Sequence, residues 1–276
     1  MRMLSRGLSG TLKWLFLIFI MLTIILPIGW IMISAFKTEV QIIRYPPHYF
    51  ATELVLKNFQ TLFKRAPVLL YIRNTVIYVV LLTLGQLLVD TMAAYAFARM
   101  DFRGRHVLFT ILLAAMMIPF QVIMIPLFIE LSAFRMVNTY YGLVIPRLVS
   151  VTGIFMLRAY FATLPAALEE AGRIDGLREA GIFIRIMLPL CMPVLITHAV
   201  LSFNMGWNDL LYPLLMTSSI EKRMLANGLA NLVGTDSTEY GPAFAGAVVS
   251  IVPALMFYIF GQKYFVNSIV SSGIKE

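Results

Sequence analysis

Residues 164–181 read Leu-Pro-Ala-Ala-Leu-Glu-Glu-Ala-Gly-Arg-Ile-Asp-Gly-Leu-Arg-Glu-Ala-Gly, a charged stretch within a strongly apolar chain. Pro165 suits the first turn of a helix, and Glu169 and Glu170 follow where the helix dipole favours carboxylates. Asp175-Gly176 is a turn signal that ends this helix. The stretch therefore predicts a short charged helix followed by a tight turn.

The loop that contains this helix, residues 158–185, holds four basic and four acidic residues and is neutral overall. A loop that binds lipid headgroups is expected to be basic, whereas mixed charge suits docking to a soluble protein. Ala167, Ala171 and Ile174 recur at helical spacing. They form a small face that fits a shallow cleft on such a partner.

The composition of the whole chain is that of an integral membrane protein. Of its 276 residues, 60% are hydrophobic and 13% are charged, against about 25% charged in an average soluble domain. These values exclude a soluble domain and a disordered chain. The net charge is +8. Because the basic residues lie between the apolar runs, contact with lipid headgroups explains them better than binding to nucleic acid. The lone Cys191 excludes an intrachain disulfide, and no metal-ligand spacing occurs in the sequence.

Six apolar runs are long enough to cross a bilayer as helices. We therefore expect an all-α, polytopic membrane protein with six transmembrane helices in a single domain, residues 1–276. Six spans place both termini on one side, and the basic residues of the N-terminal tail and of residues 99–106 favour the cytoplasmic side. The predicted spans are residues 14–33, 76–98, 107–129, 140–157, 186–216 and 243–260.

Polar residues within spans are candidates for function, because the bilayer interior penalises them. Asp90 is expected to pair with Arg147 or to reach the interface, and the lone His198 is expected to be a packing residue. Amide, carboxylate and aromatic groups together can bind sugars, although the same residues can also pack helices together. The candidates for lining a translocation pathway are Gln121, Arg147, Asn204, Trp207, Asn208 and Asp209.

Proline is frequent within the predicted spans. Broken helices are tolerated where other helices or a cavity satisfy the freed carbonyl groups, and such breaks suit a transport pathway. The alternative is that proline is simply commoner in membrane helices. The prolines concerned are Pro119, Pro126, Pro146, Pro193, Pro213 and Pro253.

The charged loop resembles the EAA loop of ABC-importer permeases. Glu170-Ala171-Gly172 is followed by three residues and Gly176, then by nine residues and the sequence Ile-Met-Leu-Pro at 186–189. The family pattern is Glu-Ala-Ala, three residues, Gly, nine residues, Ile-x-Leu-Pro, so Gly172 is the one departure. The resemblance implies a coupling loop over residues 164–189 that docks into a cleft on a cytoplasmic ATPase subunit.

Further motifs resemble carbohydrate-type permeases, in particular the second permease subunit of maltose-type importers. They are Ala-Ala-Tyr-Ala-Phe-Ala-Arg at 93–99, Phe-Arg-Gly-Arg at 102–105, Val-Asn-Thr-Tyr at 137–140, Gly-Ile-Phe at 153–155, Trp-Asn-Asp at 207–209 and Gln-Lys-Tyr-Phe-Val-Asn at 262–267. The resemblance implies a type I ABC importer permease fold. It also implies import of a mono- or oligosaccharide across a bacterial or archaeal cytoplasmic membrane, with both termini in the cytoplasm.

The family resemblance also implies the partners. They are a second, homologous permease in a heterodimer, two cytoplasmic ATPase subunits and an extracytoplasmic solute-binding protein. The chain has no Gly-x-x-x-x-Gly-Lys-Ser/Thr phosphate loop, so we expect a subunit that is not itself an enzyme and binds no cofactor. ATP and magnesium are expected on the partner ATPase.

The resemblance assigns two contact regions. Glu170 is expected to meet a basic residue of the ATPase, although it could instead only stabilise the start of its own helix. The full set of docking candidates is Glu169, Glu170, Ala171, Gly172, Asp175 and Gly176. In the outer segment 217–241, Asp236, Glu239 and Tyr240 are candidates for binding-protein contact, with a solvated turn as the alternative. The tail, residues 268–276, either reaches the ATPase or is a frayed end.

Other functions remain open at this point. An ABC importer for glycerol phosphate or another non-sugar solute is the main alternative, and an anionic substrate favours Arg147 facing the pathway. A secondary transporter predicts inverted repeats or paired intramembrane charges, and the sequence indicates neither. An intramembrane enzyme needs a catalytic constellation, but His48, His106 and His198 are scattered along the chain.

Overall fold

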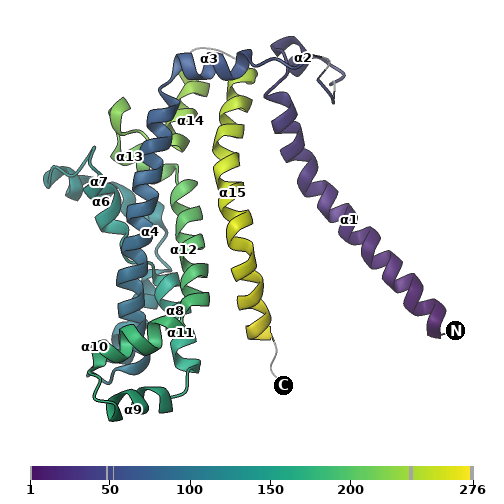
Figure 1. Ribbon diagram of the computed structural model, residues 1–276. Coiled ribbons are helices and arrows are strands. Elements are labelled where there is room, and N and C mark those ends of the chain that lie inside the picture. The colour runs from purple at the N-terminus through teal and green to yellow at the C-terminus, as the bar shows by residue number, and fades with distance from the viewer. Residues whose placement is uncertain (1, 48, 52, 236–238, 274–276) are drawn as a thin grey trace. The chain divides into compact units, whose positions relative to one another are not determined.

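The computed structural model describes residues 2–47, 49–51, 53–235 and 239–273, with side chains described over 12–47, 49–51, 53–231 and 239–259. Throughout this described part the chain forms helices and connecting turns, and no strand occurs (Figure 1). The predicted all-α class is confirmed.

Internal contacts divide the chain into two compact units. The first unit comprises residues 1–68 and 229–252, and the second comprises residues 69–228 and 253–276. The prediction of a single domain over residues 1–276 stays a prediction. Both units contain helix segments that are apolar enough to span a membrane.

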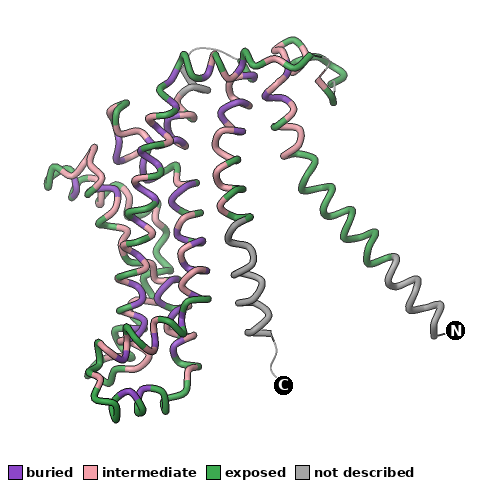
Figure 2. The backbone as a smooth tube through the Cα atoms, viewed as in Figure 1, coloured by how far each residue is buried: buried purple, intermediate pink, exposed green. Residues whose placement is uncertain are grey.

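Among the described residues, three helices are continuous and long enough to cross a membrane. They are α1 (Arg2–Ser34), α4 (Val68–Arg99) and α15 (Tyr240–Gly273). The apolar window of α1 is entirely exposed, whereas a third of that of α4 is buried within the protein (Figure 2). An exposed apolar helix of this kind is stable in contact with lipid or another membrane protein, which agrees with the predicted class.

The other predicted spans are bent pairs of helices. Helices α5 (Arg105–Ala115) and α6 (Phe120–Ala133) meet at 98°. Helix α7 (Tyr140–Val144) and the turn η1 (Ile145–Arg147) meet α8 (Val151–Thr163) at 43°. The third pair is bent by 77° and joins α10 (Glu179–Ile182), the π-helix η2 (Phe183–Met187) and α11 (Leu188–Leu190) to α12 (Met192–Trp207). If each pair counts as one span, the described part of the chain offers six crossings.

Proline lies at each of the three breaks. Pro119 precedes α6, Pro146 lies within η1, and Pro193 occupies the first turn of α12. A proline has no N–H and its ring clashes with the preceding turn, so a helix tends to end before it. Broken helices are therefore found at these prolines, whereas Pro126 and Pro253 lie inside continuous helices.

The remaining helices are short. They are α2 (Glu39–Ile43), α3 (Lys57–Arg65), α9 (Ala167–Ile174), α13 (Leu211–Met216), the turn η3 (Ile220–Lys222) and α14 (Leu225–Thr235). The fifth predicted span, 186–216, differs most from the structure, because α12 ends at Trp207 and α13 begins afresh at Leu211.

The apolar core of the second unit packs α4 against α5, α8, η2 and α12. Phe161 and Leu157 of α8, Ile182 of α10 and Met187 of the π-helix η2 are fully buried there. Tyr95 of α4 packs edge-on against Phe161 with ring centroids 5.6 Å apart. This core supports α9, which lies crosswise at one end of the unit (Figure 1).

Candidate functional site

Helix α9 is the short charged helix predicted from residues 164–181. It is closed by Gly176, whose φ of 80° lies in the left-handed region. The Gly176 N–H donates to the Arg173 carbonyl at 3.1 Å, and the Leu177 N–H donates to the Gly172 carbonyl at 2.9 Å. This pair of bonds is the Schellman motif, in which glycine is favoured because it lacks a Cβ atom.

Four of the six docking candidates lie on the exposed side of α9 and its closing turn. They are Glu170, Ala171, Asp175 and Gly176. Ile174 lies beside them with 87% of its surface exposed. None of the described residues covers this apolar side chain, which leaves it available for contact with a partner.

Glu169 and Gly172 lie on the opposite side of α9, against the protein. Glu169 is buried and forms an ion pair with Arg99, with 3.6 Å between Glu169 Oε1 and Arg99 Nε. A Cβ atom on Gly172 would lie 2.7 Å from Ile186 Cδ1. The departure from the family pattern at Gly172 thus allows α9 to pack closely on the segment that follows it. These two residues hold the helix in place, and docking by the other four stays a prediction.

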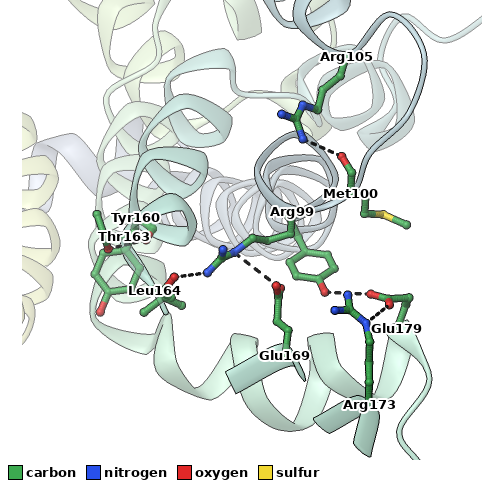
Figure 3. A network of polar contacts seen from close by, with 10 residues as sticks. Arg99, Met100, Arg105, Tyr160, Thr163, Leu164, Glu169, Arg173 and Glu179 are labelled. Atoms are coloured by element: carbon green, nitrogen blue, oxygen red, sulfur yellow. Dashed lines mark hydrogen bonds and ion pairs between the residues drawn. The ribbon is translucent and has the colours of Figure 1, made fainter. Parts of the chain in front are cut away.

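Two further side chains fix the loop around α9 (Figure 3). Arg99 Nη2 donates to the carbonyl of Leu164, the residue that ends α8. Glu179 Oε1 accepts from Arg173 Nε at 3.0 Å, and its Oε2 accepts from the Tyr95 hydroxyl at 3.5 Å. The hydrogen bond from Arg173 to Glu179 raises the pKa of the guanidinium further above its usual range.

A second polar cluster lies at the far end of the same unit. Arg147 of η1 forms an ion pair with Asp209, which lies between α12 and α13. The Tyr78 hydroxyl donates to Asp209 Oδ2 at 3.2 Å and accepts from Arg147 Nη1 at 3.0 Å. The structure thus brings together two of the pathway candidates. It also corrects the expectation that the spans hold no paired charges.

A third cluster, centred on Asp90, corrects the expectation that this residue pairs with Arg147. Asp90 Oδ2 lies 2.8 Å from His198 Nε2, and both side chains are buried. Asp90 Oδ1 accepts the Ser150 N–H at 3.0 Å, and His198 Nδ1 lies 3.4 Å from Ser202 Oγ. The expectation that His198 is a packing residue is confirmed, with Asp90 as its partner.

Comparison with known proteins gives these clusters a context. Residues 90–269 match the family described as the binding-protein-dependent transport system inner membrane component. The chain belongs to this family.

Individual relatives cover nearly the whole chain. The arabinooligosaccharides transport system permease protein AraQ of Halalkalibacterium halodurans is 34% identical over 99% of this chain and all of its own length. The lactose transport system permease protein LacG of Rhizobium radiobacter is 30% identical over 90% of each chain. A crystal structure of a bacterial ABC transporter for import of the acidic polysaccharide alginate matches 95% of this chain and 98% of its own, with 22% identity and a TM-score of 0.82. That last likeness shows the fold, which is the predicted ABC importer permease fold.

Of the remaining pathway candidates of this inner membrane component, three lie together at the end of α12 and one lies on α6. Gln121 is exposed on α6. Asn204 and Asn208 are exposed near the end of α12, where Asn208 Nδ2 donates to Asn204 Oδ1 at 2.9 Å. Trp207 is buried and stacked on Phe203 with ring centroids 5.7 Å apart. Trp207 is therefore buried among packed side chains, whereas the two asparagines are exposed.

The binding-protein candidates are only partly described. Asp236 lies outside the described residues. Glu239 forms an ion pair with Arg65 at 2.8 Å, and the Tyr240 and Gly241 N–H groups donate to the two carboxylate oxygens of Glu39 at 2.9 and 3.0 Å. Glu39 thereby satisfies the free N–H groups at the start of α15. Contact with a binding protein stays a prediction.

Sequence reasoning missed Arg99, Tyr78, Gln86 and Asn74 as site residues. All four lie on α4. Asn74 and Tyr78 are four residues apart, as are Gln86 and Asp90. Residues four apart share one face of a helix, and the side chains of Asn74, Tyr78, Gln86 and Asp90 are buried. Pairs of polar residues at helical spacing within an apolar helix were the signal that could have found them.

The Schellman turn gives a first prediction. We expect Gly176→Ala to cost about 1–2 kcal/mol, because an alanine in the left-handed conformation is strained. Amide hydrogen exchange in residues 172–177 should then be roughly tenfold faster. Gly181→Ala is the matched control, since Gly181 has no positive φ and a Cβ atom there would lie 3.4 Å from Leu177 Cδ2. Equal exchange in the two variants would contradict the role of Gly176.

The Asp90 cluster gives a second prediction. Asp90→Ala leaves the buried His198 ring and the Ser150 N–H without their partner, at about 1–3 kcal/mol for each unpaired group. We expect a clear fall in Tm, measured on the purified protein in mild detergent. The exposed Asp101 provides the control, and Asp101→Ala should change stability by no more than about 0.5 kcal/mol. A Tm of Asp90→Ala equal to that of the control would show that the cluster adds nothing to stability.

Proposed function

We propose that this chain is the membrane-spanning permease subunit of a binding-protein-dependent ABC importer that carries a mono- or oligosaccharide inward. The observation that supports this most directly is the outward face of α9, where Ala171, Ile174 and Glu170 are exposed at the end of a closely packed unit. The relatives named above are permeases for arabinooligosaccharides and for lactose. Their shared substrate class supports a sugar.

The exposed face of α9 also supports a proposal for the partners of this chain. We infer that α9 docks into a cleft on one of two cytoplasmic ATPase subunits, which hold ATP and magnesium. A second, homologous permease completes a heterodimer, and an extracytoplasmic binding protein delivers the sugar. Four of the six crossings precede α9 and two follow it. An even number on each side supports both termini lying in the cytoplasm with the docking loop.

The charge distribution favours an uncharged substrate over glycerol phosphate. An importer of an anion needs a cation facing the pathway, and Arg147 was the candidate. Its guanidinium is instead paired with Asp209 and bonded to Tyr78. The amide groups of Asn204 and Asn208, which can both donate and accept hydrogen bonds, are better suited to sugar hydroxyls. We propose that these two asparagines line the pathway.

Docking can be tested by co-purification. We expect Ala171→Trp to abolish recovery of the ATPase with the chain, because the indole would block a shallow cleft, while the partner permease is retained. Ala162→Trp is the matched control, since Ala162 is also exposed but lies on α8. Glu170→Ala should lower recovery of the ATPase while changing stability by about 1 kcal/mol or less, which is the scale of a helix-dipole contribution. Full recovery with Ala171→Trp would place the docking surface elsewhere.

The substrate class can be tested by uptake. Cells that produce the chain with its partner subunits should accumulate radiolabelled arabinotriose or lactose in an ATP-dependent way, and cells without the chain should not. Glycerol 3-phosphate serves as the anionic comparison. Uptake of glycerol 3-phosphate without uptake of either sugar would replace the sugar assignment by the anionic alternative.

A further inference from the structure

Arg99, the last residue of α4, contacts the docking loop at two places. Its Nη2 donates to the Leu164 carbonyl just before α9, and its Nε faces Glu169 Oε1 in the first turn of α9 (Figure 3). The two side chains are 13% and 7% exposed. One guanidinium on a long membrane-spanning helix therefore bonds to the entry of the docking helix and faces a carboxylate in its first turn.

The contact between Arg99 and Glu169 is incomplete. Within the described part of the chain, Arg99 Nε and Glu169 Oε1 are both buried and neither makes a hydrogen bond. Their separation of 3.6 Å exceeds the roughly 2.7–2.9 Å of a charge-assisted hydrogen bond. A shift of α9 toward α4 by about 1 Å would bring the two atoms to hydrogen-bond distance. The new bond would stabilise two buried charged groups. The contact is therefore sensitive to small movements of the docking helix.

Beyond Arg99, α4 is bonded firmly to the other spans. One turn earlier, the Tyr95 ring packs against Phe161 of α8 and against Phe183 with centroids 5.6 and 5.0 Å apart. Further along, Asp90 bonds to Ser150 at the start of α8 and to His198 of α12. These closed contacts make α4 move together with α8 and α12.

We propose that Arg99 is the positioning residue that couples the docking helix to the membrane-spanning part of the protein. Through Leu164 and Glu169 it converts a displacement of α9 into a displacement of α4 and of the helices bonded to α4. Glu169 lies on the side of α9 that faces the protein, where its carboxylate is paired with Arg99. The inference rests on the proposed function, because it requires an ATPase that moves α9.

The test uses the whole complex of this chain, its partner permease and the ATPase in lipid nanodiscs. Asn204→Cys on α12 is the reporter, because Asn204 is exposed whereas the native Cys191 is fully buried. Three quantities are measured: the amount of ATPase bound, the rate of ATP hydrolysis, and the rate of maleimide labelling at the reporter. Labelling is compared without nucleotide and after trapping with magnesium, ATP and vanadate.

With the reporter alone, we expect the labelling rate to change several-fold on trapping. Arg99→Ala should still bind the ATPase and hydrolyse ATP, but its labelling rate should no longer respond to trapping. Arg99→Lys should restore part of the response, because a lysine keeps the charge but lacks the fork that reaches two acceptors. Glu169→Gln should weaken the response. Arg103→Ala, which replaces an exposed arginine of the next loop, should leave it intact.

Three outcomes would overturn the inference. One is a full labelling response in Arg99→Ala. Another is loss of bound ATPase in Arg99→Ala, which would mean that Arg99 only shapes the docking surface. The third applies if Arg99→Ala does not fold. Full labelling responses to trapping in both Arg99→Lys and Glu169→Gln would then contradict the inference. A reporter chain that binds no ATPase at all contradicts the proposed function instead, and this is seen before any Arg99 variant is made.

Discussion

The structure of the second unit depends on one constraint: most of the polar side chains of α4 bond to partners inside the protein, although Thr83 Oγ1 is buried without a partner among the described residues. A helix in a bilayer has no water to satisfy such groups, and α4 has several within an otherwise apolar run. Asn74 bonds to the carbonyls of Glu221 and Arg223. Tyr78 joins the Arg147 and Asp209 pair, Gln86 donates to the Arg147 carbonyl, Asp90 meets Ser150 and His198, and Arg99 meets Leu164. Each bond fixes a different segment against the same helix.

The partners of α4 are mostly the ends of broken helices. A helix end leaves N–H and carbonyl groups without partners, and these are costly at membrane depth. Gln86 satisfies a carbonyl in η1, Asp90 accepts from the residue before α8, and Arg99 donates to the residue that ends α8. A continuous helix thus makes the interrupted ones stable. The prolines interrupt the helices. The polar side chains of α4 bond to groups that these breaks leave without partners, which stabilises the broken helices in a membrane.

Local features were predictable from the sequence, and non-local pairs were not. The number of apolar runs, the short helix at 167–174 and the turn at Gly176 all follow from periodicity and turn chemistry over a few residues. The Arg147–Asp209 pair joins positions 62 residues apart, and the Asp90–His198 pair joins positions 108 residues apart. Only the packing of the spans brings these residues together. The inward position of Glu169 and Gly172 was available from helical spacing, since they lie three residues apart on the face opposite Ala167, Ala171 and Ile174.

The polar contacts of α4 are not equally tight, and the difference has a direction. In the middle of the helix Asp90 makes closed hydrogen bonds of 2.8 and 3.0 Å, and at the far end Tyr78 bonds to both members of an ion pair. At the docking end Arg99 bonds directly to the Leu164 carbonyl, but the two contacts that reach carboxylates are looser, because Arg99–Glu169 is open at 3.6 Å and Tyr95–Glu179 is long at 3.5 Å. In the coupling that we propose through Arg99, movement of α9 first opens or closes these two contacts. Further movement of α9 is then carried through the closed contacts of Asp90 to α8 and α12.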